Sequence, residues 1–112
     1  MSETLNNTGA GLTFLFGLLA FVKPRAYAKI ILFEPMKKGA ITEIRSTYGG
    51  LIMGLSAYVL WSQSVTAFHT LAFGWFALAI ARFAGTLLDK SFSKMTLVFL
   101  AIEIVTGILC FV

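Results

Sequence analysis

The chain has 112 residues, of which 58% are hydrophobic and only 12% are charged, and its mean hydropathy is +0.87. Water-soluble domains typically carry about 25% charged residues, and a chain of this size cannot hide so much apolar surface from water. The composition therefore argues against a soluble globular fold and against disorder. It indicates a single integral membrane domain over residues 1–112.

The chain contains one cysteine and one histidine, Cys110 and His69. A single cysteine cannot form an intramolecular disulfide, and the sequence has no Cys/His pattern for zinc, haem or iron–sulfur ligation. We therefore expect no metal and no cofactor. The formal charge of +4 does not indicate nucleic acid, because the cations cluster beside apolar segments, where they orient a membrane protein and meet anionic lipid.

Four apolar segments are each expected to cross the membrane as a helix, and they span residues 5–22, 44–61, 68–88 and 95–112. A spanning helix needs about 20 residues. Backbone polar groups in lipid must be hydrogen-bonded internally, which favours helix for all four segments. We expect the first segment to be retained rather than cleaved as a signal peptide, because no Lys or Arg precedes it.

A shorter segment, residues 24–33, follows the first span. Pro24 is favourable at the first position of a helix, and Arg25 and Lys29 lie four residues apart on one helical face. This pattern predicts an interfacial amphipathic helix between spans one and two. A loop, or an extension of the first span beyond a kink, is the alternative. The later connections are short and force antiparallel neighbours, so the expected fold is an all-α polytopic membrane four-helix bundle.

The distribution of basic residues predicts the orientation of the chain. All nine lie in or next to the first and third connections, and they are Lys23, Arg25, Lys29, Lys37, Lys38, Arg45, Arg82, Lys90 and Lys94. By the positive-inside rule these two connections are cytoplasmic. Both termini are then periplasmic if the cell is bacterial, and the protein is expected in the cell inner membrane.

Charged residues within the spans are the main candidates for a functional site, because intramembrane charge is costly. Glu103 lies nine residues after Lys94, about 13–14 Å from that end of the fourth span and near the midplane, and we expect it to pair with Arg82. The full predicted polar cluster is Glu43, Arg45, Tyr48, Arg82, Asp89 and Glu103. It is either a cytoplasm-facing pocket for an anionic lipid headgroup or small amphiphile, or a buried ion pair that locks the bundle.

Glycines in the later spans are candidates for close helix packing, and they are Gly49, Gly50, Gly54, Gly85 and Gly107. The pair at positions 50 and 54 has the small-xxx-small spacing typical of helix contacts in membranes. We expect these residues to pack within the monomer, with a homodimer interface as the alternative.

Residues 45–50 read Arg-Ser-Thr-Tyr-Gly-Gly, residues 81–85 read Ala-Arg-Phe-Ala-Gly, and residues 102–104 read Ile-Glu-Ile. In this order the three motifs resemble a bacterial domain-of-unknown-function family of small four-helix membrane proteins that carries an Arg-x-x-Tyr-Gly-Gly signature and is distantly similar to DoxX-like proteins. The resemblance implies that the polar cluster and the neighbouring glycines form a related site. It implies no reaction.

The expected function is therefore non-enzymatic. The protein is interpreted as an accessory subunit of a larger membrane complex or as a lipid- or amphiphile-binding protein, with membrane lipids, a larger complex or a second copy of the chain as partners. A small proton-coupled transporter using Glu103 is the alternative, because intramembrane carboxylates mark proton relays. A lipid- or quinone-modifying enzyme is a further alternative, although no second carboxylate or histidine lies at matching depth.

Overall fold

The computed structural model describes residues 2–31 and 38–112. Within these residues the chain is helical and contains no strand. In chain order the elements are α1 (Glu3–Val22), α2 (Pro24–Ile30), α3 (Lys38–Glu43), the π-helix η1 (Ile44–Gly50), α4 (Leu51–Ser62), α5 (Val65–Asp89) and α6 (Lys94–Phe111). The predicted amphipathic segment thus begins as a helix at its proline, while its residues 32 and 33 lie outside the described residues.

Three of the described helices, α1, α5 and α6, are long and apolar enough to cross a membrane. The predicted span at residues 44–61 differs from them, because it begins as the seven-residue π-helix η1 and its α-helical part, α4, has 12 residues. The Leu51 N–H donates to the carbonyl of Ser46, five residues earlier, which is the π pattern. Two consecutive glycines, which have low α-helix propensity, are the last two residues of η1. The count of four spanning α-helices is therefore not confirmed.

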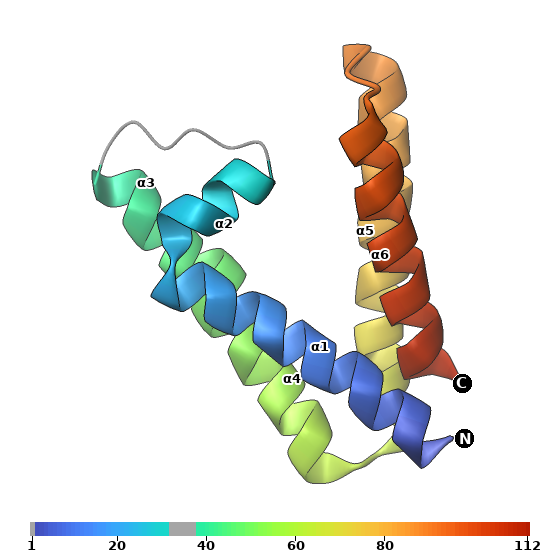
Figure 1. Cartoon of the computed structure of the whole chain (residues 1–112). Coiled ribbons are helices and arrows are strands. Elements are labelled where there is room, and N and C mark those ends of the chain that lie inside the picture. Colours follow the sequence, from blue (N-terminus) through green and yellow to red (C-terminus); the bar gives the residue numbers. More distant parts are fainter. Residues whose placement is uncertain (1, 32–37) are drawn as a thin grey trace.

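Two antiparallel helix pairs form the fold. In the first pair, which we call the α1–α4 arm, α1 packs on η1 and α4, and α2 also packs on α1. In the second pair, which we call the α5–α6 arm, α5 packs on α6. The arms meet where α1 packs on α6, near the two termini, and diverge toward α2 and the α5–α6 turn (Figure 1). The molecule is a flat V of 41 × 30 × 16 Å rather than the expected compact bundle, because short connections fix only the packing of sequential neighbours.

The inner face of α1 carries small or polar side chains at spacings of three and four residues. Its buried residues are Asn6, Gly9, Ala10, Thr13, Gly17 and Ala20. Many large hydrophobic side chains are exposed instead, including Trp61, Ile80 and Leu88. This distribution is typical of a membrane protein, in which lipid covers the large apolar side chains and small residues allow helices to approach closely.

Two of the predicted packing glycines, Gly49 and Gly107, lie at close helix contacts. A Cβ added at Gly49 would lie 3.0 Å from the Cβ of Phe21, and one at Gly107 would lie 2.5 Å from the ring of Phe76. Close packing also occurs on α1, at Gly9 and Gly17.

Within residues 2–31 and 38–112, no close helix contact is found at the other three predicted packing glycines. A Cβ at Gly54 would meet nothing within 4 Å, and one at Gly50 would meet only the carbonyl of Arg45, at 3.8 Å. At Gly85 the neighbour is the carboxylate of Asp89, at 4.0 Å on the same helix. A packing role for Gly50, Gly54 and Gly85, within the chain or between two copies of it, stays a prediction.

The last turn of α6 is capped by the two helices beside it. The final four carbonyls of a helix have no partner within that helix. The Asn6 side-chain amide donates to two of these carbonyls at 2.9 and 3.1 Å, and Nε2 of His69 lies 3.1 Å from the carbonyl oxygen of Phe111. The N–H of Ser2 donates to the carbonyl of Val112 at 2.9 Å. The contacts of Ser2 and Asn6 hold the two arms together at the end that carries both termini.

Candidate functional site

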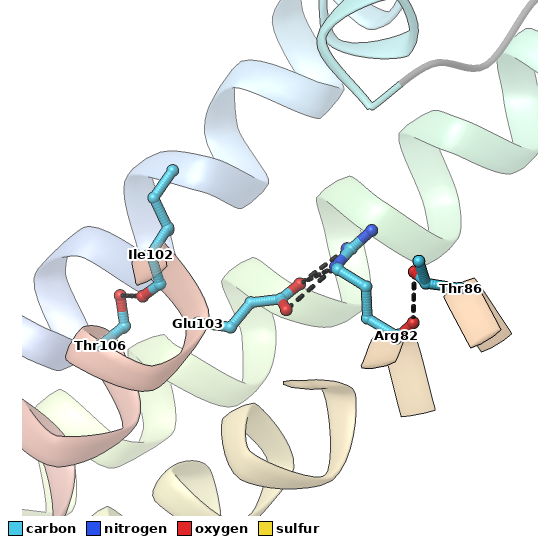
Figure 2. Close-up of polar contacts among 5 residues, drawn as sticks. All are labelled: Arg82, Thr86, Ile102, Glu103 and Thr106. Carbon is cyan, nitrogen blue, oxygen red and sulfur yellow. Dashed lines mark hydrogen bonds and ion pairs between the residues drawn. The ribbon is translucent and has the colours of Figure 1, made fainter. Parts of the chain in front are cut away.

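The expected pairing of Arg82 with Glu103 is present between α5 and α6 (Figure 2). Nε of Arg82 donates to Oε1 at 3.0 Å and to Oε2 at 2.8 Å, and Nη2 lies 2.6 Å from Oε2. The Glu103 side chain is only 4% exposed, whereas the Arg82 side chain is 28% exposed. A buried carboxylate is thus neutralised by a guanidinium that still reaches the protein surface.

The antiparallel packing of α5 on α6 brings this pair together. Arg82 lies about 10 Å before the C-terminal end of α5, and Glu103 about 14 Å after the start of α6. Because a short turn joins these two ends, both residues lie at a similar height in the α5–α6 arm. Glu103 belongs to the buried face of α6, which directs its carboxylate into the arm rather than toward lipid.

The guanidinium of Arg82 makes one further contact on α6. Its central carbon lies 4.8 Å from the ring centroid of Phe99, one turn before Glu103, in a cation–π arrangement. A guanidinium carries five N–H donors. Within residues 2–31 and 38–112, no hydrogen bond from Nη1 of Arg82 to another residue is found. N–H donors of the Arg82 guanidinium therefore remain available to a ligand.

Two tyrosines of the α1–α4 arm lie together opposite this pair. The ring centroids of Tyr27 on α2 and Tyr48 on η1 are 5.8 Å apart, and both rings pack against a buried cluster of Ala20, Ala28 and Ile44. Burial raises the pKa of Tyr27 above its usual value, Tyr48 and Glu103 raise it further, and Arg82 opposes them. The charges on the α5–α6 arm therefore lie within electrostatic reach of Tyr27.

The remaining members of the predicted cluster lie apart from the pair. Arg45 is exposed, and its guanidinium lies 5.8 Å from the ring centroid of Phe21 on α1. Glu43 is exposed and accepts a long hydrogen bond of 3.5 Å from Thr47. Asp89 is exposed at the end of α5, two turns beyond the pair. The structure does not bring these three to the pair, because the arms diverge at this end of the molecule (Figure 1).

An apolar cleft of about 310 Å³ lies between α1 and α6. It is lined by Leu12, Phe16, Ala101, Ile102, Val105 and Thr106. The hydroxyl of Thr106 donates to the carbonyl of Ile102 at 2.7 Å, so the lining offers hydrocarbon rather than a free polar group. Ile102 and Thr106 flank Glu103 on α6 (Figure 2). One stretch of α6 thus serves both the cleft and the ion pair.

The sequence matches the protein family described as Domain of unknown function (DUF4345) over residues 8–112. The chain belongs to this family. No curated protein and no solved structure matches it. The expected membership of a domain-of-unknown-function family is confirmed, and the matched range includes the ion pair, both tyrosines and the apolar cleft.

In this DUF4345 protein, the motif at residues 45–50 lies within the π-helix η1. π-Helical turns are rare and occur frequently at functional sites. Here the π-helix packs directly on α1, with Gly49 against the backbone of Phe21, and it places Tyr48 beside Tyr27. An α-helix over residues 45–50, which the sequence analysis expects, does not predict this arrangement.

Sequence reasoning missed two residues of this site, Tyr27 and Phe99. Tyr27 lies within the predicted amphipathic segment and Phe99 within the fourth predicted span, and neither is among the predicted site residues. Phe99 had a signal, since it lies four residues before Glu103 on the same helical face. Tyr27 had none, because its position depends on how the two arms pack. Among the described residues, no group of three or more His, Cys, Asp or Glu side chains is arranged to hold a metal ion.

Proposed function

We propose that this chain is a non-enzymatic integral membrane protein that binds an amphiphile between its two arms. One observation carries the proposal: the guanidinium of Arg82, held by buried Glu103, remains partly exposed, and the residues next to Glu103 on α6 line an apolar cleft between the arms. A polar headgroup would bind the guanidinium, and the hydrocarbon chain would occupy the cleft. Small-molecule sites commonly combine an apolar lining with few polar anchors.

The proposal includes four membrane spans, with η1 and α4 together forming the fourth. Residues 44–62 are helical without interruption, and at 1.5 Å per residue they extend about 28 Å, close to the thickness of a bilayer core. The basic residues of α2 and of the α5–α6 turn lie at one end of the molecule (Figure 1). This supports a pocket that faces the cytoplasm and periplasmic termini in a bacterial inner membrane. A distant relationship to DoxX-like proteins is part of the same proposal and rests on the order of the three motifs.

An accessory subunit of a larger membrane complex is a second candidate function, supported by the exposed face of α4. A Cβ at Gly54 would meet nothing within 4 Å, and Ala57, three residues later, is also exposed. Small residues on an uncovered face allow a partner helix to approach closely.

Proton-coupled transport and lipid or quinone modification receive less support from the site geometry. Both uses require Glu103 to exchange a proton. Its two carboxylate oxygens are engaged by Arg82 at 2.6–3.0 Å, and separating the pair would leave a buried charge without a partner.

Native mass spectrometry of the protein, extracted from its own membrane in mild detergent, tests the proposal. We expect a recurrent small mass that is lost in Arg82→Gln and retained in Lys94→Gln, which removes the same charge at the exposed start of α6. A recurrent partner chain without a small molecule would favour the accessory subunit. A protein that carries neither would contradict both candidates.

A further inference from the structure

The net charge of the ion pair restricts which amphiphile can bind. The formal charges of Arg82 and Glu103 cancel, and their contacts are short, at 2.6–3.0 Å. The pair lies about 10–14 Å from the end of the arm, at membrane depth. A ligand that joins this site therefore meets a neutral centre rather than a free cation.

The donors that remain at the site are suited to an acceptor oxygen. Nε and Nη2 of Arg82 are committed to Glu103, whereas Nη1 has no hydrogen bond within the part of the chain that the structure describes. Phe99 covers one face of the guanidinium, which leaves its edge to a ligand.

We infer that the site binds an uncharged amphiphile whose headgroup presents a carbonyl oxygen, in preference to an anionic lipid. This inference rests on the proposed function and names the chemical class of its ligand. A carbonyl accepts from Nη1 and leaves the site neutral. An anion would either add a net negative charge at membrane depth or displace Glu103, which is 4% exposed, and both outcomes are costly.

The preference for an uncharged headgroup depends on the negative charge of Glu103. Glu103→Gln keeps an acceptor for Arg82 and the size of the side chain, but it leaves the guanidinium with an uncompensated positive charge. An anionic headgroup then neutralises the site instead of adding charge to it. The variant is therefore expected to shift selectivity toward anionic amphiphiles.

The experiment is a competition between dioctanoylglycerol and dioctanoylphosphatidylglycerol for the purified full chain in detergent, read by native mass spectrometry. The two probes share acyl chains and ester carbonyls and differ in the charged phosphate. Decylubiquinone, which carries ring carbonyls, serves as a third probe that distinguishes a quinone from a glyceride. Lys94→Gln is the matched control, because it removes one exposed charge far from the pair.

We expect the wild-type chain to favour dioctanoylglycerol or decylubiquinone over dioctanoylphosphatidylglycerol by about tenfold or more, equivalent to about 1.4 kcal/mol. Glu103→Gln should lower this ratio by about tenfold, and Lys94→Gln should leave it unchanged. A wild-type preference for the anionic probe would overturn the inference and leave the proposed function intact. Failure of all three probes to bind would overturn the proposed function itself. If Glu103→Gln does not fold, the wild-type ratio alone decides.

Discussion

Arg82 and Glu103 form an asymmetric pair, in which the acid is buried and the base is partly exposed. The exposed fractions of the side chains are 4% for Glu103 and 28% for Arg82. Loss of the base strands a carboxylate inside the arm, whereas loss of the acid leaves a long side chain that can turn toward the interface. The two truncations are therefore not equivalent.

Arg82→Ala is expected to lower the free energy of unfolding by about 3–5 kcal/mol, the usual cost of breaking a buried ion pair from one side. Glu103→Ala should cost less, and the double variant should be more stable than Arg82→Ala alone, because the stranded charge is gone. Denaturant titration in mixed micelles measures all three. Lys94→Ala, on the exposed start of α6, is the control. Equal losses in the two single variants would contradict the asymmetry.

Gly17 and Gly54 provide a matched test of helix packing. A Cβ at Gly17 would lie 2.9 Å from the backbone nitrogen of Met53 and 3.0 Å from the carbonyl oxygen of Gly49, so α1 must move away from η1 and α4. Gly17→Ala should cost about 1–3 kcal/mol. Gly54→Ala meets nothing and should be neutral or stabilising by up to about 1 kcal/mol, because alanine is the better helix former. The same unfolding assay checks both, and a neutral Gly17→Ala would refute the close contact.

His69 and Phe111 connect α5 to the end of α6 through both a ring stack and a hydrogen bond. The ring centroids are 4.6 Å apart, and Nε2 of His69 lies 3.1 Å from the Phe111 carbonyl oxygen. His69→Phe retains the stack and removes the hydrogen bond, so we expect a loss of about 0.5–1.5 kcal/mol. Thr70→Val removes only a bond within α5 and serves as the control. A similar loss in both variants would show that capping of α6 is not the cause.

The phenol of Tyr27 makes the stability of the chain depend on alkaline pH. Burial raises its folded-state pKa above the usual value of 10.0. Its contribution to stability is therefore complete below about pH 10 and is lost as the pH rises through the folded-state pKa. Tyr27→Phe should remove this decline, whereas Tyr58→Phe, at an exposed site on α4, should not. Phenolate absorbance and unfolding across this range measure both, and an unchanged decline in Tyr27→Phe would count against a buried phenol.

Hydropathy and residue spacing predicted the parts of the fold that depend on local sequence. The spans that became α1, α5 and α6 are long apolar segments. The Arg82–Glu103 pair followed from their depth on sequential, antiparallel helices. The small-residue face of α1, at Gly9, Thr13 and Gly17, also follows a helical spacing in the sequence.

The arrangement of the arms could not be predicted in the same way. Short connections determine which helices are neighbours, but they do not determine the angle between two helix pairs, so the V shape, the cleft beside Phe16 and the position of Tyr27 were missed. η1 was missed because a π-helix and an α-helix over residues 44–50 have the same composition. Arg45 was expected near the Arg82–Glu103 pair, but its guanidinium lies over the ring of Phe21 instead.

The proposed orientation can be tested at the first turn of α5 and in the α5–α6 connection, which lie at opposite ends of the α5–α6 arm. In a Cys110→Ala background, Thr66→Cys and Ser91→Cys each introduce one thiol at an exposed position. We expect a membrane-impermeant maleimide to label Thr66→Cys in intact cells and Ser91→Cys only after the membrane is opened, because the basic residues lie at the end that carries Ser91. Labelling in detergent provides the control for reactivity. The reverse pattern would invert the topology and place Arg82 toward the periplasm, whereas equal labelling of both would indicate dual insertion.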